Sequence, residues 1–252
     1  AKMESRAKEF WKPEWKIKDE FTQRTNEKID QNETMNSTDT VILEGREFAV
    51  HPGVFSPSIF IGSKFLCNKL CEFLPDSGTF LEIGSGCGCV AVLVAQNRPR
   101  LRIFAVDISQ SALENTLENL KRHRLTDRVK VTQSDVMDAF VDAGEVEKFD
   151  CVFWNYPFHH TDKSIGQLTM TERAIRDPNY ACLHKLFDQA SQLVSPGGKV
   201  LIGFSIKMGI VEALVAIARH YGWQTQEKAN GLDFEGERTS MAIFECVRFN
   251  DA

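Results

Sequence analysis

Residues 80–88, Phe-Leu-Glu-Ile-Gly-Ser-Gly-Cys-Gly, combine an apolar run, an acid and three alternating glycines. This pattern predicts a buried strand that ends in a tight turn and leads into a helix beginning near Val90. Glycine has no Cβ, so the turn can bring its backbone close to a ligand that the first helical amides then face. The next apolar run, 103–106, ends at Asp107. A carboxylate at that strand tip can accept hydrogen bonds from ribose hydroxyls.

The spacing and chemistry of these residues favour a nucleoside that carries no diphosphate. Gly84 and Asp107 are 107 − 84 = 23 residues apart, close to the ~20 of a nucleotide-binding βαβ unit. The dinucleotide fingerprint is G-x-G-x-x-G/A, but Cys89 follows Gly88 here and the pattern is G-x-G-x-G. Glu82 would repel a diphosphate and suits a cationic nucleoside better.

This stretch resembles motif I of the class I S-adenosylmethionine-dependent methyltransferases, and Asp107 matches their ribose-binding acid. The resemblance implies S-adenosyl-L-methionine as cofactor and S-adenosyl-L-homocysteine as product. It also implies adenine contacts from Asp135 and Val136, which follow the third strand: one bonds the adenine amino group and the other packs on the ring. The expected cofactor-binding residues are Glu82, Gly84, Ser85, Gly86, Cys87, Gly88, Asp107, Ile108, Asp135, Val136 and Asn155.

The fourth strand runs into Asn155-Tyr156-Pro157-Phe158-His159, which is similar to the Asn-Pro-Pro-Phe/Tyr motif of methyltransferases that act on amino or amide nitrogens. A planar amino group is a poor nucleophile because its lone pair is delocalised, so two acceptors must hold its hydrogens. The Asn155 oxygen and a following backbone carbonyl can do this, and Phe158 can stack on a flat substrate. Alignment for in-line attack then supplies much of the rate. The expected catalytic residues are Asn155, Tyr156, Pro157 and Phe158.

Tyr156 stands where the family has its first proline. Tyrosine keeps the backbone carbonyl but adds a bulky side chain, which either reshapes the acceptor pocket or points away. Residues 51–56, His-Pro-Gly-Val-Phe-Ser, look like the segment before the cofactor motif in the "small domain" methyltransferases. That branch includes ribosomal RNA guanine-N2 enzymes, whose loop often ends in Phe-His, and grades into release-factor glutamine methyltransferases. The expected substrate-binding residues are Phe158, His159, His51 and Phe55.

Strands and helices alternate along the rest of the chain. This order predicts an α/β, Rossmann-like doubly wound fold with a mostly parallel seven-stranded sheet and helices on both faces. The carboxyl ends of its strands would gather Glu82, Asp107, Asp135 and Asn155 at one edge. Strands are expected at 80–83, 103–106, 129–132, 151–154, 200–204, near 223–225 and at 240–246, and helices at 59–73, 90–96, 109–123, 180–193 and 207–221.

A small helical and hairpin extension is expected at 1–50, before an S-adenosylmethionine-binding domain at 51–252. The extension either packs on that domain or forms a lid over its site. Its expected parts are a short amphipathic helix with Phe10, Trp11, Trp15 and Ile17 broken near Pro13, a loop at 27–39, and hairpin strands at 41–43 and 48–50.

Composition narrows the setting of the protein. The 252 residues carry a formal net charge of −5, which does not suggest a protein dominated by attraction to nucleic acid. The seven cysteines lack zinc-site spacing, no metal is expected, and an odd count without a secretory signal fits the reducing cytoplasm. No apolar run approaches membrane-spanning length, so no membrane is expected as partner.

The sequence leaves the methyl acceptor undecided between a small-molecule amine and an RNA or protein group. Negative charge and Tyr156 favour a small molecule, whereas the resemblance and the arginines of 98–128 favour a macromolecule. A nicotinamide-dependent oxidoreductase and a non-catalytic methyltransferase-like partner protein are the competing classes. The oligomeric state and the number of methyl transfers stay open.

Overall fold

The computed structural model describes residues 2–141, 147–232 and 239–249. Every strand expected from the apolar runs is present, most of them extended by a few residues at their ends. The strands are β1 (Asp39–Leu43), β2 (Arg46–Val50), β3 (Ser77–Ile83), β4 (Arg100–Asp107), β5 (Val129–Gln133), β6 (Phe149–Asn155), β7 (Val194–Ser205), β8 (Trp223–Asn230) and β9 (Met241–Arg248).

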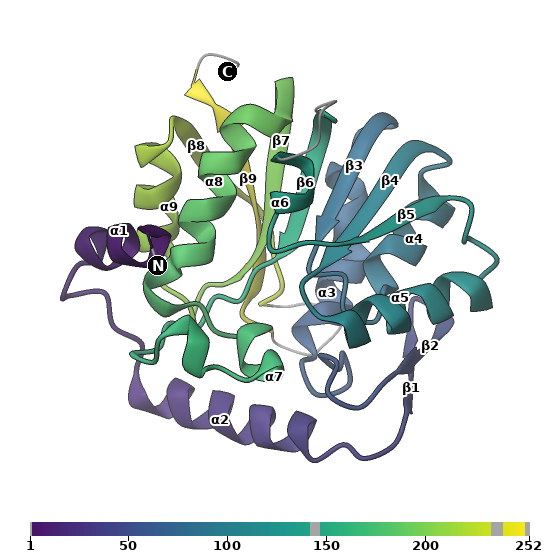
Figure 1. Ribbon diagram of the computed structural model, residues 1–252, viewed down its shortest axis with the longest axis horizontal. Helices are drawn as coiled ribbons and strands as arrows, with labels where there is room; N and C mark the ends of the chain where they lie inside the picture. Colours follow the sequence, from purple (N-terminus) through teal and green to yellow (C-terminus); the bar gives the residue numbers. More distant parts are fainter. Residues whose placement is uncertain (1, 142–146, 233–238, 250–252) are drawn as a thin grey trace.

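Seven of these strands form one sheet in the order β5-β4-β3-β6-β7-β9-β8 (Figure 1). The pairs from β5 to β7 are parallel, and β9 is antiparallel to both β7 and β8. β3 and β6 are neighbours although β4 and β5 lie between them in the chain, so the strand order reverses there. Ligands of open α/β sheets bind at this kind of switch point. The predicted fold class is confirmed.

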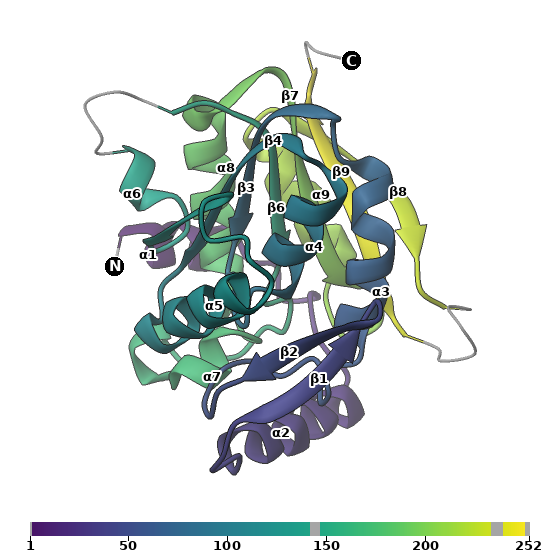
Figure 2. The same ribbon diagram turned by 90° about the vertical axis from the view of Figure 1, so that its right-hand side faces the viewer.

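Helices cover both faces of the sheet (Figures 1 and 2). They are α1 (Lys2–Phe10), α2 (Asp19–Glu33), α3 (Gly62–Lys69), α4 (Cys89–Asn97), α5 (Gln110–Arg122), α6 (Asp138–Val141), α7 (Met170–Arg173), α8 (Ala181–Leu193) and α9 (Val211–His220), with 3-10 turns η1 (Leu70–Phe73), η2 (Ile165–Gln167) and η3 (Pro178–Tyr180). The last of the expected long helices begins at Val211 rather than 207.

Alternation along the strands divides the apolar core in two. Leu81 and Ile83 of β3 face the side covered by α8 and α9, whereas Phe80 faces the side covered by α3 and α4. Successive side chains of a strand point to opposite faces, so both layers of helices bury apolar area against the same strands. The carboxyl edge of β3–β6 is therefore held rigidly from both sides.

The N-terminal extension differs in part from the prediction. The loop expected at 27–39 is wrong over 27–33, because α2 runs from Asp19 to Glu33. Its buried residues are Thr25, Ile29 and Asn32, so the helix buries one face that is mostly polar and leaves no apolar period in the sequence. The helix expected around Trp11 and Trp15 ends at Phe10, before these aromatic residues.

The hairpin of β1 and β2 is present and lies with α2 at the same end of the molecule as the carboxyl edge of the sheet (Figure 2). Within the three described ranges, no helix has both the length and the apolar character needed to cross a membrane.

Candidate active site

The turn after β3 is held open by three glycines in left-handed conformations. Gly84, Gly86 and Gly88 have φ of 68°, 56° and 80°, values that side chains rarely adopt. A Cβ on Gly86 would meet nothing within 4 Å, whereas one on Gly88 would lie 3.0 Å from Thr116 Cα. Gly86 therefore borders open space, and Gly88 allows α4 and α5 to pack closely. Gly88, an expected cofactor contact, does not itself line the cavity.

Two acids lie at the tips of β3 and β4. Glu82 is 3% exposed, and its Oε2 has no hydrogen-bond partner among the described residues. Asp107 Oδ2 accepts from the Gly86 amide at 3.0 Å, and its Oδ1 accepts from the Ser109 amide at 2.9 Å. Asp107 thus ties the glycine turn to the start of α5.

Burial governs the electrostatics of both acids. It raises the pKa of the Glu82 carboxyl well above its usual range, and the nearby Cys87 and Asp107 raise it further. Burial also raises the pKa of Asp107, against the hydrogen bonds from Gly86 and Ser109. A buried acceptor without a donor is costly, so a cationic or hydrogen-donating group beside Glu82 would be stabilised there.

A cavity opens at the carboxyl ends of β3, β4, β5 and β6. Asp135 and Val136 line it beyond β5, and the Asp135 carboxylate also pairs with Lys185 at 2.9 Å. The expected cofactor-binding residues that line this cavity are Glu82, Gly84, Ser85, Gly86, Cys87, Asp107, Ile108, Asp135, Val136 and Asn155.

Asn155 ends β6 and lines the same cavity, as does Pro157. It stands in register with Gly203 of β7, whose carbonyl accepts from the Tyr156 amide at 3.0 Å. The Tyr180 hydroxyl donates to the Phe158 carbonyl at 2.5 Å. The loop after β6 is therefore fixed by the next strand and by η3.

The Tyr156 side chain takes the second of its two expected directions and points away from the cavity. It is 1% exposed, and its hydroxyl donates to Asp177 Oδ2 at 2.5 Å. Its ring stacks with that of Phe204, with centroids 5.8 Å apart. The residue can contribute to the site only through its backbone.

Three residues expected at the substrate lie outside this cavity. Phe158 is half-buried, with its ring 6.1 Å from that of Phe204. His159 is buried and borders a separate hollow beside Trp11 and Trp15. Both placements have one cause, because the sequence cannot say to which side of the loop each side chain turns.

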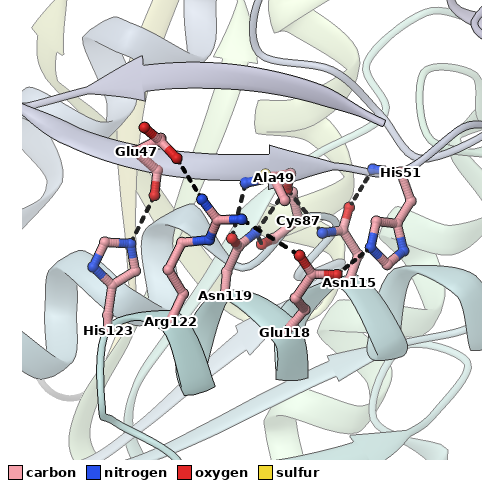
Figure 3. Close-up of polar contacts among 9 residues, drawn as sticks. All are labelled: Glu47, Ala49, His51, Cys87, Asn115, Glu118, Asn119, Arg122 and His123. Atoms are coloured by element: carbon pink, nitrogen blue, oxygen red, sulfur yellow. Dashed lines mark hydrogen bonds and ion pairs between the residues drawn. The ribbon is translucent and has the colours of Figure 1, made fainter. Parts of the chain in front are cut away.

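His51 is the third of these residues, and its contacts belong to the docking of the hairpin on α5 (Figure 3). Its ring nitrogen lies 2.6 Å from Glu118, and its backbone amide donates to Asn115 Oδ1 at 2.9 Å. Beside it, Asn119 donates to the carbonyls of Ala49 and Cys87 at 2.7 and 2.8 Å. Side chains of α5 thus tie β2 to the glycine turn.

The lining residues that do not come from the carboxyl ends of the strands were only partly expected. Phe55 lines the cavity, as expected, and stacks on Phe60 with centroids 4.4 Å apart. Met170, Arg173 and Ala174 line it from the segment of α7. A polar stretch between the catalytic loop and the next helix was the only sequence signal for them.

The side chains that line this cavity suit a cationic adenosyl group. Glu82 Oε2 lacks a donor, Gly86 borders open space, and three carboxylates line the cavity. The described residues contain no cluster of three or more metal-binding side chains.

A sequence profile described as "Methyltransferase small domain" matches residues 45–230. The chain belongs to this family. Its class uses S-adenosylmethionine, and the residues at the cavity fit that cofactor: Asp107 would hold the ribose, Asp135 and Val136 the adenine, and Glu82 the ammonium end. The cofactor supplies an electrophilic methyl group on a sulfonium.

Each of the curated relatives matches only part of this chain, and the matched part is less than half of the relative's own length. A bifunctional methyltransferase of Rickettsia conorii is 28% identical over 68% of this chain and 32% of its own length. A release factor glutamine methyltransferase of Aquifex aeolicus is 31% identical over 45% of this chain and 39% of its own. A tRNA1(Val) (adenine(37)-N6)-methyltransferase of Porphyromonas gingivalis is 30% identical over 48% of each. The chain spans about a third to a half of these relatives.

Solved structures show the same fold. A ribosomal protein L11 methylase of Lactobacillus delbrueckii aligns with a TM-score of 0.55 over 79% of this chain and 83% of its own, at 14% identity. TrmK of M. capricolum, in complex with S-adenosyl-homocysteine, aligns with a TM-score of 0.51 over 73% of this chain and 68% of its own, at 15% identity.

Proposed function

We propose that this chain transfers a methyl group from S-adenosylmethionine to a planar amino or amide nitrogen. One observation carries the proposal: Asn155, at the tip of β6, lines the same cavity as Glu82 and Asp107. β3 and β6 are paired strands, so the residue suited to hold a nitrogen lies beside the residues suited to hold the donor. Names of the curated relatives, which include glutamine and adenine N6 methyltransferases, support the same reading.

The residues at the cavity would act mainly by positioning. Asn155 Oδ1 would accept one N–H of the acceptor, and the backbone carbonyl of Tyr156 would accept the other. Both bonds direct the nitrogen lone pair towards the donor carbon, and they strengthen as the nitrogen becomes cationic. The nitrogen then loses its proton to water. Fixed alignment of the reacting atoms is the main source of rate in such a site.

The lining residues outside the donor strands favour an uncharged acceptor. They include Phe55, Pro57, Met170, Arg173 and Ala174, among which there is a cation and no carboxylate. The carboxylates of the cavity, Glu82, Asp107 and Asp135, all lie at the donor strands. A cationic amine would need an acid or an aromatic cage near the acceptor, so a side-chain amide or an aromatic amino group fits better.

Charge near the opening argues against a polyanion. α2 contains five acids and two basic residues, Arg24 and Lys28, and the net charge is −5. We therefore infer a protein amide or a small flat molecule as acceptor, and treat RNA as the alternative. Activity on RNA would fall steeply with added salt, whereas activity on an amide would change little.

The seven cysteines are free thiols. Because structural disulfides persist in oxidising compartments, seven free thiols support a reducing one, and we include a cytoplasmic location in the proposal.

Two measurements test the function. Isothermal titration should show S-adenosyl-homocysteine binding to the folded protein, and absence of binding would refute the donor. Transfer of a labelled methyl group should then be followed with a glutamine-containing peptide, an adenosine-containing RNA and a set of arylamines.

Asn155→Ala should lower turnover by roughly a hundredfold and change the affinity for S-adenosyl-homocysteine by less than about threefold. Asn68→Ala, at a half-buried asparagine that bonds Glu44 away from the cavity, is the matched control. Turnover unchanged in Asn155→Ala would contradict the acceptor role, and no turnover with any acceptor would support a non-catalytic partner protein. Tight binding of reduced nicotinamide cofactor, followed by its fluorescence, would instead favour the oxidoreductase.

A further inference from the structure

The acceptor half of the cavity lies between two walls that belong to different parts of the chain. We call them the loop wall, formed by residues 53–57, and the α7 wall, formed by residues 170–174. The loop wall precedes β3, and the α7 wall follows β6. Neither wall is part of the central sheet, so something else must hold them at a fixed separation.

α2 contacts both walls. The Asn32 side chain is fully buried and makes two hydrogen bonds to the loop wall: its Nδ2 donates to the Val54 carbonyl at 3.1 Å, and its Oδ1 accepts from the Ser56 amide at 3.0 Å. A paired contact of this kind fixes both the position and the orientation of the loop.

α2 is also linked to the α7 wall, through Asn26 and through Glu33. The Arg176 guanidinium, 7% exposed, donates to Asn26 Oδ1 and to Glu172 at 3.1 Å. The Thr169 hydroxyl, at the N-cap of α7, donates to Glu33 at 2.6 Å. Asn32 therefore holds the loop wall directly, whereas Asn26 reaches the α7 wall through Arg176, beside the contact of Glu33 with Thr169.

The attachment of α2 is polar rather than apolar. Ile29 is its one buried apolar side chain, beside buried Thr25 and Asn32. α1 differs, because Phe10 packs against His184 and the Trp11 ring that follows packs against Tyr180. Segments with little buried apolar contact open at a lower free energy than the global fold, so α2 can release without unfolding the sheet.

We propose that Asn26 and Asn32 are positioning residues that act as one clamp and set the width of the acceptor entrance. With the clamp closed, the gap admits a flat group such as a single amide; when α2 lifts, the cavity opens for exchange. The inference rests on the proposed function for what enters the gap, but not for the opening itself.

Four cysteines report on the cavity without any need for turnover. Cys67, Cys87, Cys89 and Cys182 line it, whereas Cys151 and Cys246 are buried in the sheet away from it. Alkylation by iodoacetamide, followed at each cysteine by mass spectrometry, therefore separates opening of the cavity from global unfolding.

Asn32→Ala and Asn26→Ala should each speed alkylation of the cavity cysteines by roughly tenfold, the effect of losing about 1.4 kcal/mol of hydrogen bonding. The rates at Cys151 and Cys246 should stay within about twofold. Gln31→Ala, on the exposed face of α2, is the matched control and should leave every rate unchanged.

The double variant decides whether the two asparagines form one clamp. If a single helix bridges both walls, losing either contact opens the gap, and the double variant should label no faster than the faster single variant. Rates that multiply would mean two independent contacts and would overturn the proposal. Equal acceleration at all cysteines, or no acceleration, would overturn it too.

A further alkylation experiment, with S-adenosyl-homocysteine present, distinguishes failure of the clamp from failure of the proposed function. S-adenosyl-homocysteine should slow alkylation of the cavity cysteines in the wild type. If it gives no protection while the clamp variants behave as expected, the proposed donor is wrong and the clamp stands. With a working acceptor, Asn32→Ala should raise KM for that acceptor more than it lowers kcat; the reverse order would argue against a role in acceptor entry.

Discussion

The Tyr156 hydroxyl donates a 2.5 Å hydrogen bond to Asp177 Oδ2 in the core behind the acceptor loop. The same oxygen accepts the amides of Cys182 and Leu183 at 2.8 and 3.2 Å. Asp177 thus joins the loop after β6 to the first turn of α8. This chain therefore fixes the loop by a buried side-chain anchor at the position where the Asn-Pro-Pro-Phe/Tyr motif has a proline.

Tyr156→Phe should destabilise the protein by about 1–3 kcal/mol, because the buried Asp177 carboxyl loses a donor and the ring packing stays. Urea unfolding at pH 7 measures the loss. Affinity for S-adenosyl-homocysteine should stay within about threefold. A large loss of that affinity without a loss of stability would contradict an anchoring role.

Asp177 should make stability depend on pH near neutrality. Burial raises the pKa of its carboxyl to about 7 against an unfolded value of 3.8, although the hydrogen bonds from Tyr156, Cys182 and Leu183 lower it. Between these values the folded state binds more protons than the unfolded state, so its contribution to stability falls as pH rises from about 4 to about 7. Above pH 7 the loss is complete.

The comparison with Asp177→Asn isolates this effect. Burial lowers the pKa of His159 and His184 to about 4. The contribution of these two histidines to the stability of the protein has the opposite pH dependence, because it is lost as pH falls. The difference in unfolding free energy between wild type and Asp177→Asn, measured from pH 5 to 8, should decline with pH and then level off. A difference in unfolding free energy that does not change with pH would show that folding does not raise the pKa of Asp177.

Gly203→Ala should lower the catalytic rate without changing the binding of the methyl donor. An added Cβ would lie 3.3 Å from Asn155 Oδ1 and 2.9 Å from Leu66 Cδ1, so the Asn155 amide must shift. Misplacement of a positioning group by a fraction of an ångström should lower kcat by roughly tenfold, with unchanged affinity for S-adenosyl-homocysteine. Gly166→Ala, where a Cβ would meet nothing within 4 Å, should behave as wild type.

Asn119→Ala should cost about 2–4 kcal/mol of stability. The Asn119 side chain is fully buried and bonds both the hairpin and the glycine turn (Figure 3). Removing it leaves buried backbone groups without partners. Because the Cys87 carbonyl is one of them, donor affinity should fall as well. Asn68→Ala should stay within about 0.5 kcal/mol, and equal losses in the two variants would disprove the bridging role.

The central strands could be predicted because β3, β4, β6 and β7 each contain a run of four or more residues that are mostly apolar. The donor-binding part of the cavity could then be predicted from the strands. The carboxyl ends of parallel strands meet at one edge of the sheet, where Glu82, Asp107 and Asp135 lie. Local sequence patterns were sufficient for these residues because the direction of a parallel strand determines at which edge of the sheet its last residue lies.

Residues on irregular segments could not be placed in this way. His51 and His159 lie within the matched motifs, but only tertiary packing decides which way a loop side chain turns. α2 was missed because its buried face holds Thr25 and Asn32, which leave no apolar period. The direction of Tyr156 depended on Asp177, which lies 177 − 156 = 21 residues further along.

The pairing of β3 with β6 has a consequence for how such enzymes diversify. The stretch from Glu82 to Val136 forms most of one half of the cavity, whereas 155–174 comes from a later stretch of chain. A recombination or a run of mutations in the later stretch can change which nitrogen is alkylated while the earlier stretch keeps its geometry. Chains built this way can inherit one half intact and explore new chemistry with the other.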